Sequence, residues 1–155
     1  MSIKEKISSL GLSLPTAAAP VAAYVPAVKS GNLVFTAGQL PVVDGKLPKE
    51  GMVGRDVTAE EAKELAQICA LNALAAISLV TDLDQIERVI RVGGFVNCAP
   101  GFKAIPGVIN GASEFLIKVF GDVNGKHART AVGVAELPLN SPVEVEIIVQ
   151  LKFSH

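Results

Sequence analysis

The last strand-like segment of the chain constrains the fold more than any other feature. From Val143 to Phe153, apolar residues at every second position alternate with Glu144, Glu146, Ile148, Gln150 and Lys152. Successive side chains of a β-strand point to opposite faces, so this period of two predicts a strand with one wholly apolar face. Other elements must cover that face. The second face mixes charge with Ile148, which favours contact with a neighbouring subunit.

Two segments with helical periodicity can supply the cover. Thr58 and Glu61 form a capping-box pattern that opens an Ala-rich helix to about Val80. A second helix is predicted over 108–120, with Gly121 at its end. Small residues on the first helix would let it lie close to a sheet.

The remaining segments predict a layered α/β domain. Strands are predicted at 25–28 and 33–36 around a turn at Ser30-Gly31-Asn32, at 86–97 with a bulge or close approach at Gly93-Gly94, and from Arg129. The order strand, strand, helix, strand, helix, strand, strand predicts an α/β sandwich with both helices on one face of the sheet. We expect residues 1–23 to form a short helix and an extended arm, and 24–155 a single domain.

Composition limits the partners that such a domain can have. Lys and Arg number 14 against 15 Asp and Glu, so no excess of positive charge favours nucleic acid. Hydrophobic residues make up 50% and charged residues only 19%, below the roughly 25% usual in soluble domains. Pro15, Pro20 and Pro26 interrupt the apolar N-terminal region, which argues against a membrane span. The apolar surplus therefore predicts a homo-oligomer.

The two cysteines and the N-terminus predict a cytoplasmic protein without a metal site. Cys69 and Cys98 have neither metal-ligand spacing nor the pattern of a disulfide scaffold. The first six residues carry mixed charge and precede a stretch broken by prolines, unlike a secretion signal.

Arg129 and Glu144 are the strongest candidates for chemistry. Each lies near the head of a strand-like segment, and the chain has only four arginines. If Leu137 and Val143 close a hairpin, Arg129 and Glu144 lie seven residues apart along it, roughly 23 Å, and on opposite sheet faces. The pair would then have to meet across a subunit interface.

Several blocks resemble the reactive-intermediate deaminase family, also called the YjgF or endoribonuclease L-PSP family. They are Ala23-Tyr24-Val25, Thr36-Ala37-Gly38-Gln39-Leu40-Pro41, the segment from Val108-Ile109-Asn110 to Phe115, and Ala128-Arg129 through Leu137-Pro138 to Val143-Glu144-Val145-Glu146. The similarity spans Tyr24 to Phe153. It implies a chorismate-mutase-like fold with a mixed sheet, a homotrimer with clefts between subunits, and no cofactor.

The resemblance also implies an activity and the residues that perform it. Members of the catalytic branch hydrolyse reactive 2-imino acids to 2-oxo acids and ammonia. By the resemblance, Arg129 binds the substrate carboxylate and the Gly38 N–H donates to the same group. Glu144 positions or deprotonates the attacking water, while Tyr24 and Asn110 line the cleft.

Three departures from the family pattern indicate a divergent branch. Ala131 replaces a frequent cysteine, Ala37 a frequent serine, and His127 a frequent proline before Ala-Arg. Ala37 and Ala131 would make the site roomier and less polar, which could favour a larger or more apolar ligand. His127 lies in a loop by this pattern, and we expect it to be exposed.

Each candidate residue also has a structural explanation. Arg129 could be an ion-pair partner, Glu144 a solvated strand residue, Tyr24 an interface side chain, Asn110 a helix cap and Gly38 a strand-end glycine. The hypotheses are an imine deaminase, a non-catalytic trimeric module that binds a small carboxylate, and, least favoured without a basic stripe, an endoribonuclease.

Overall fold

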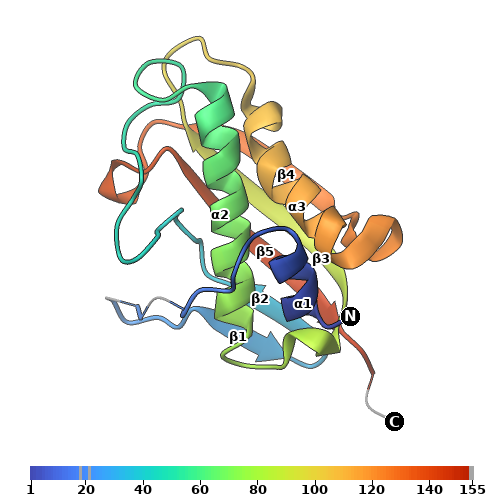
Figure 1. Cartoon of the computed structure of the whole chain (residues 1–155). Coiled ribbons are helices and arrows are strands. Elements are labelled where there is room, and N and C mark those ends of the chain that lie inside the picture. Colours follow the sequence, from blue (N-terminus) through green and yellow to red (C-terminus); the bar gives the residue numbers. More distant parts are fainter. Residues whose placement is uncertain (18, 21, 154–155) are drawn as a thin grey trace.

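The computed structural model describes residues 1–17, 19–20 and 22–153. The predicted arm and the end of the predicted domain therefore fall partly outside the described residues. Figure 1 shows one sheet with two long helices, α2 and α3, packed side by side across one of its faces. This arrangement confirms the predicted α/β sandwich.

The sheet has five strands in the order β1-β2-β5-β3-β4. They are β1 (Ala27–Ser30), β2 (Leu33–Thr36), β3 (Ile86–Asn97), β4 (Ala128–Val134) and β5 (Val143–Leu151). β3 and β4 pair in parallel, while all other neighbours are antiparallel, so the sheet is mixed. The first strand begins two residues later than predicted, and the two-residue turn at Gly31 and Asn32 joins it to β2 as expected.

The helices begin and end for local chemical reasons. α2 (Ala59–Ile77) starts at the predicted capping box, where Thr58 Oγ1 accepts from the Glu61 N–H at 3.1 Å and the Glu61 carboxylate accepts from the Thr58 N–H at 2.9 Å. α3 (Ile105–Gly125) is longer than predicted. Gly121, with φ of +85°, interrupts α3 instead of ending it. No helix within the described ranges is both long and apolar enough to cross a membrane.

Three glycines allow close approaches, two of them between packed elements and one between neighbouring strands. A Cβ on Gly111 of α3 would overlap with the Lys63 carbonyl of α2, and one on Gly94 of β3 would lie 2.6 Å from Ile109 of α3. On the opposite face of β3, a Cβ on Gly93 would lie 2.9 Å from Glu146. The close approach predicted for Gly93-Gly94 is confirmed, whereas the register shifts of β3 lie nearer its start.

The N-terminal helix α1 (Ile3–Ser9) is held against the domain. Its Ile3 and Ile7 side chains are buried in the core. The Ile3 N–H donates to Asp84 Oδ1 at 2.7 Å, in the short 3-10 helix η1 (Leu83–Gln85) that precedes β3. Burial of two isoleucines stabilises this docking by a few kcal/mol.

The predicted hairpin between Leu137 and Val143 is wrong. β4 pairs only with β3 in the described sheet, and β5 lies on the other side of β3, between it and β2. The cause is the helix α3, which carries the chain from β3 back to a parallel position on the outer edge. β5 then crosses to the centre, where its alternating apolar face is covered by the helices.

Candidate functional site

Arg129 lies on the edge strand β4 and reaches toward α3. Its partner in the parallel register is Val92, which is fully buried beneath the helices, so Arg129 lies on the helix-covered face. The guanidinium donates from Nη1 to Asn110 Oδ1 at 2.7 Å and to Ser113 Oγ at 3.3 Å. Nη2 donates to the Pro106 carbonyl at 3.4 Å. Three neutral acceptors from one helix therefore orient the half-buried guanidinium.

Asn110 and Ser113 reach the same guanidinium because they lie three residues apart on α3, and residues at this spacing share a helix face. Asn110 therefore does more than cap the helix, which begins five residues earlier. Ser113 is not evident from the sequence, although its spacing from Asn110 is the signal that could have identified it.

His127 is half-buried, and the expectation of an exposed loop residue is wrong. Its Nε2 lies 2.9 Å from Ser113 Oγ, and its Nδ1 lies 2.6 Å from the Gly125 carbonyl. Burial lowers the pKa of His127 below its usual 6.5; the hydrogen bond to the Gly125 carbonyl opposes part of this effect, and the charge of Arg129 adds the smallest contribution, which also lowers the pKa. His127 is therefore neutral at pH 7.

Arg129 has no carboxylate within 4.0 Å among residues 1–17, 19–20 and 22–153. The ion pairs in those ranges join Lys49 to Glu61, Arg55 to Asp56 and Lys63 to Glu114. The structure thus does not show the ion pair that would explain Arg129 as a purely structural residue. A half-buried guanidinium held by neutral acceptors keeps its charge available for an anionic ligand.

Glu144 lies on the opposite face of the sheet, which no helix of the described part of the chain covers. It pairs with Phe95 on β3, while Arg129 pairs with Val92, three residues away along the same strand. Side chains alternate, so the odd offset puts the two on opposite faces, and two strand spacings plus three residues separate their backbones by about 14 Å. The opposite faces inferred from the sequence are correct, although the hairpin from which they were inferred is not.

Glu144 is half-buried and close to Gly38. A Cβ on Gly38 would overlap with Glu144 Oε1, so only glycine leaves room for this carboxylate. Burial raises the pKa of Glu144 above its usual 4.5, and the charge of Glu146 raises it further. Glu144 is therefore not a freely solvated strand residue.

The backbone at Gly38 has an available donor. The flanking N–H groups of Ala37 and Gln39 donate to the carbonyls of Pro26 and Val145, each at 2.8 Å. Within the described residues the Gly38 N–H has no such partner. Within the described residues, one backbone donor is therefore unpaired at Gly38, the residue that lies against the Glu144 carboxylate.

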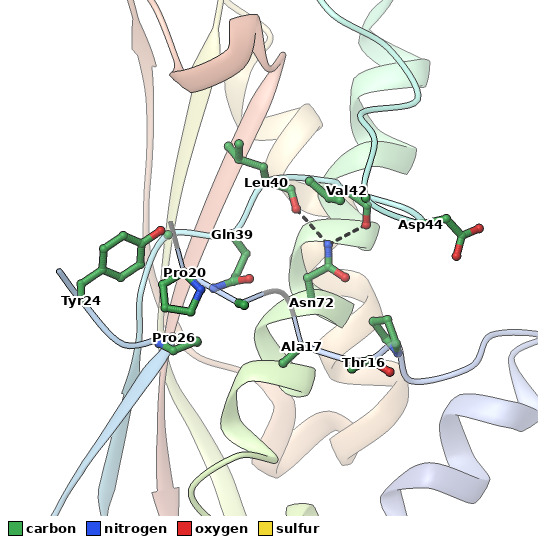
Figure 2. A pocket seen from close by; sticks show the side chains of 14 residues that line it. Thr16, Ala17, Pro20, Tyr24, Pro26, Gln39, Leu40, Val42, Asp44 and Asn72 are labelled. Carbon is green, nitrogen blue, oxygen red and sulfur yellow. Dashed lines mark hydrogen bonds between the residues drawn. The ribbon is translucent and has the colours of Figure 1, made fainter. Parts of the chain in front are cut away.

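A cavity of about 480 Å³ lies beside Gly38, between the N-terminal arm, the loop that follows β2, and α2. Tyr24 lines it with about half of its side chain exposed. Figure 2 shows Tyr24 and Gln39 toward one side of the cavity and Asn72 toward the other, where its amide donates to the carbonyls of Leu40 and Val42 at 2.9 and 3.0 Å. The lining is mostly apolar and proline-rich.

The candidate residues thus form two groups within one chain. Arg129 and Asn110 lie together with Ser113 on the helix-covered side of β4. Gly38 and Glu144 lie together on the opposite side of the sheet, and Tyr24 shares a cavity with Gly38. The described residues contain no group of three or more His, Cys, Asp and Glu placed to hold a metal.

Known proteins share the sequence pattern and the fold of this chain. Residues 4–151 match the family model described as "YjgF/chorismate mutase-like, putative endoribonuclease". A solved structure of a protein of unknown function from Agrobacterium tumefaciens is 43% identical, covers 97% of this chain and 92% of that one, and superposes with a TM-score of 0.87.

Two curated relatives cover almost the whole chain. Protein TCP17 of Trypanosoma cruzi is 40% identical over 150 residues, which are 96% of this chain and 94% of the relative. A 2-iminobutanoate/2-iminopropanoate deaminase of Dermatophagoides farinae is 31% identical over 143 residues, which are 91% of this chain and 95% of that protein.

Proposed function

Since the chain belongs to the YjgF/chorismate mutase-like family, we propose that it hydrolyses 2-imino acids, and the enamines that tautomerise to them, to 2-oxo acids and ammonia. The name of the deaminase from Dermatophagoides farinae supports this substrate class. The observation that carries the proposal is the guanidinium of Arg129, which neutral acceptors orient and no described carboxylate neutralises.

The reaction needs a carboxylate anchor, a water and one base. The planar fork of Arg129 binds the substrate carboxylate through two parallel N–H groups, and the free Gly38 N–H adds a third donor. The imine carbon is already electrophilic, so orientation and one general base suffice. No cofactor is needed for this hydrolysis.

Glu144 supplies the base in this proposal. It accepts a proton as the water oxygen bonds to the carbon of the protonated imine, which gives a neutral tetrahedral carbinolamine. The same carboxyl then returns this proton to nitrogen, and the C–N bond breaks so that ammonia leaves. The Glu144 carboxylate takes up the hydroxyl proton as the carbonyl forms and passes it to solvent. A pKa raised by burial and by Glu146 brings Glu144 nearer to the working pH, which suits a group that must both take and release a proton.

The active unit in this proposal is a homo-oligomer, and by the family resemblance a trimer. Arg129 and Glu144 lie on opposite faces about 14 Å apart, so one chain cannot present both to a substrate of a few atoms. We expect Arg129 and Asn110 of one subunit to face Gly38 and Glu144 of a neighbour, with Tyr24 near the resulting cleft.

Substitution of Arg129 tests this function. A 2-imino acid can be generated in situ by an amino acid oxidase, and the formation of 2-oxo acid and ammonia can be followed with and without the protein. We expect Arg129→Ala to lower kcat/KM at least about 100-fold, because a charged bidentate contact is lost. Arg55→Ala is the matched control, since Arg55 is exposed and pairs with Asp56. Equal activity of the Arg129 and Arg55 variants would reject the proposal.

A second candidate is a module that binds a small carboxylate without converting it. It is favoured by the same geometry, because one chain orients the Arg129 guanidinium by itself, whereas its own Glu144 lies on the opposite sheet face. This function predicts that a 2-oxo acid raises the melting temperature while the protein leaves imine hydrolysis at its spontaneous rate.

A further inference from the structure

We propose that Ser113 and His127 are positioning residues that fix the Arg129 guanidinium for its carboxylate ligand. The inference rests on the proposed function, in which Arg129 is the anchor. It assigns roles to a serine and a histidine that would not themselves touch the ligand. His127 Nε2, Ser113 Oγ and Arg129 Nη1 form one continuous chain of contacts at 2.9 and 3.3 Å.

The direction of each hydrogen bond in this chain is determined by its ends. The Gly125 carbonyl can only accept, so His127 Nδ1, 2.6 Å away, must carry the proton and donate. In a neutral imidazole Nε2 then has a free lone pair, which accepts the Ser113 hydroxyl proton. The Ser113 lone pairs are left to accept from Arg129, which can only donate.

The surroundings keep His127 in the state that this chain requires. Burial lowers the pKa of His127 most, the Gly125 carbonyl opposes this effect, and the nearby charge of Arg129 lowers the pKa slightly. The α3 groups in contact with the ring are Ser113 and the Gly125 carbonyl. Arg91, on the neighbouring strand β3, donates instead to Thr130 Oγ1 at 2.8 Å on the other face. If His127 were protonated, its Nε2 could no longer accept from Ser113, and the charge of the ring would repel Arg129. The neutral form therefore dominates near pH 7.

Positioning matters because an arginine side chain has several rotatable bonds. Holding it in one rotamer before the ligand arrives removes an ordering cost from binding. Asn110 and the Pro106 carbonyl each accept from one N–H of the guanidinium, and Ser113 adds a third acceptor whose own direction is set by His127. The plane of the fork is then defined before the carboxylate binds.

The chain makes a spectroscopic prediction for the free protein. Nitrogen-15 NMR of the imidazole at pH 7.5 should show the Nδ1–H tautomer for His127, whereas a free imidazole prefers Nε2–H. The signal is assigned by its loss in His127→Gln. Ser113→Ala should leave the Nδ1–H tautomer in place, because the Gly125 carbonyl sets it, and should shift only the Nε2 resonance, which loses its hydrogen-bond donor. An Nε2–H tautomer in the native protein would overturn the proposal, because Nε2 could not then accept from Ser113.

Binding of 2-oxobutyrate, measured by calorimetry, tests the effect on the anchor. We expect Ser113→Ala and His127→Leu each to weaken affinity about three- to tenfold, as for the net loss of one ordinary hydrogen bond, because neither residue touches the ligand itself. The double variant should be little worse than either single variant, because both changes break one chain of contacts. His127→Gln should retain most of the affinity, since an amide oxygen can accept from Ser113.

Glu114→Ala is the matched control, because Glu114 adjoins Ser113 on α3 but pairs with Lys63 of α2. Unchanged affinity in Ser113→Ala and His127→Leu, with binding lost in Arg129→Ala, would overturn this inference and leave the proposed function intact. Wild-type protein that does not bind the probe, or an Arg129→Ala variant that binds it normally, would overturn both. A lower melting temperature without weaker binding would show that the two residues serve only the fold.

Discussion

Individual side chains divide into those that a motif can identify and those that depend on packing. Arg129, Asn110 and Glu144 stand in recognisable sequence blocks. Ser113 lies inside the block from Val108 to Phe115, and His127 directly precedes Ala128-Arg129, but their roles arise where the middle of α3 meets the start of β4. The spacing of Ser113 from Asn110 indicates a shared helix face, whereas only packing shows what that face contacts.

Glu144→Gln should stabilise the protein near neutral pH while it removes the hydrolytic activity. The pKa of Glu144 is higher in the folded than in the unfolded protein. Glu144 therefore does not reduce the free energy of unfolding at a pH below its unfolded-state pKa, and reduces it as the pH rises through its folded-state pKa. Glutamine does not ionise, so the variant does not lose this stability. We expect a gain below about 1 kcal/mol at pH 7, because the half-exposed carboxylate is screened by water, and none at pH 4. Urea unfolding at both pH values measures it.

Glu146→Gln is the companion variant for this prediction. It removes the negative charge that, after burial, raises the pKa of Glu144. The acidic limb of the pH–rate profile should therefore move to lower pH. A profile that does not move would show that Glu144 is not the group whose ionisation limits the rate.

The bounds of strands and helices agree with the sequence prediction where a local periodicity sets them. The prediction fails for strand pairing, which depends on how the chain connects the strands. The limits of β2 and β3 agree with the period-two segments, and the start of α2 agrees with its capping box. The hairpin of β4 and β5 fails because a short connection between two strands does not require them to pair. The covering helices favour β5 at the centre of the sheet, where its apolar face is buried.

The contact between α2 and α3 depends on Gly111. A methyl group there would overlap with the Lys63 carbonyl, which is backbone and cannot rotate away. We expect Gly111→Ala to destabilise the fold by about 1–3 kcal/mol, since the helices must separate. Chemical unfolding gives the value.

Gly107→Ala on the same helix is the control, because its Cβ would meet nothing within 4 Å. It should be neutral or stabilise by up to about 1 kcal/mol through helix propensity. Equal effects of the two substitutions would contradict the close packing of α2 on α3.

Within residues 1–17, 19–20 and 22–153, the helices leave one sheet face uncovered, and this face carries Glu144. Phe35, Ile148 and Phe95 of adjacent strands share it with Val28 and Val132, whose side chains are 52% and 39% exposed. An apolar face of this kind, mixed with the charges of Glu146 and Arg91, suits a second copy of the chain. Composition predicted the surplus of apolar surface, but only the strand order shows where it lies.

Mixing two inactive variants tests most directly whether the site is assembled between subunits. Arg129→Ala and Glu144→Gln are each purified, combined in equal amounts and allowed to exchange subunits in mild denaturant. If each site takes Arg129 from one subunit and Glu144 from its neighbour, about one site in four regains both groups in a cyclic oligomer. We therefore predict recovery of about a quarter of wild-type imine hydrolysis. Proven exchange without any recovery would contradict a site shared between subunits.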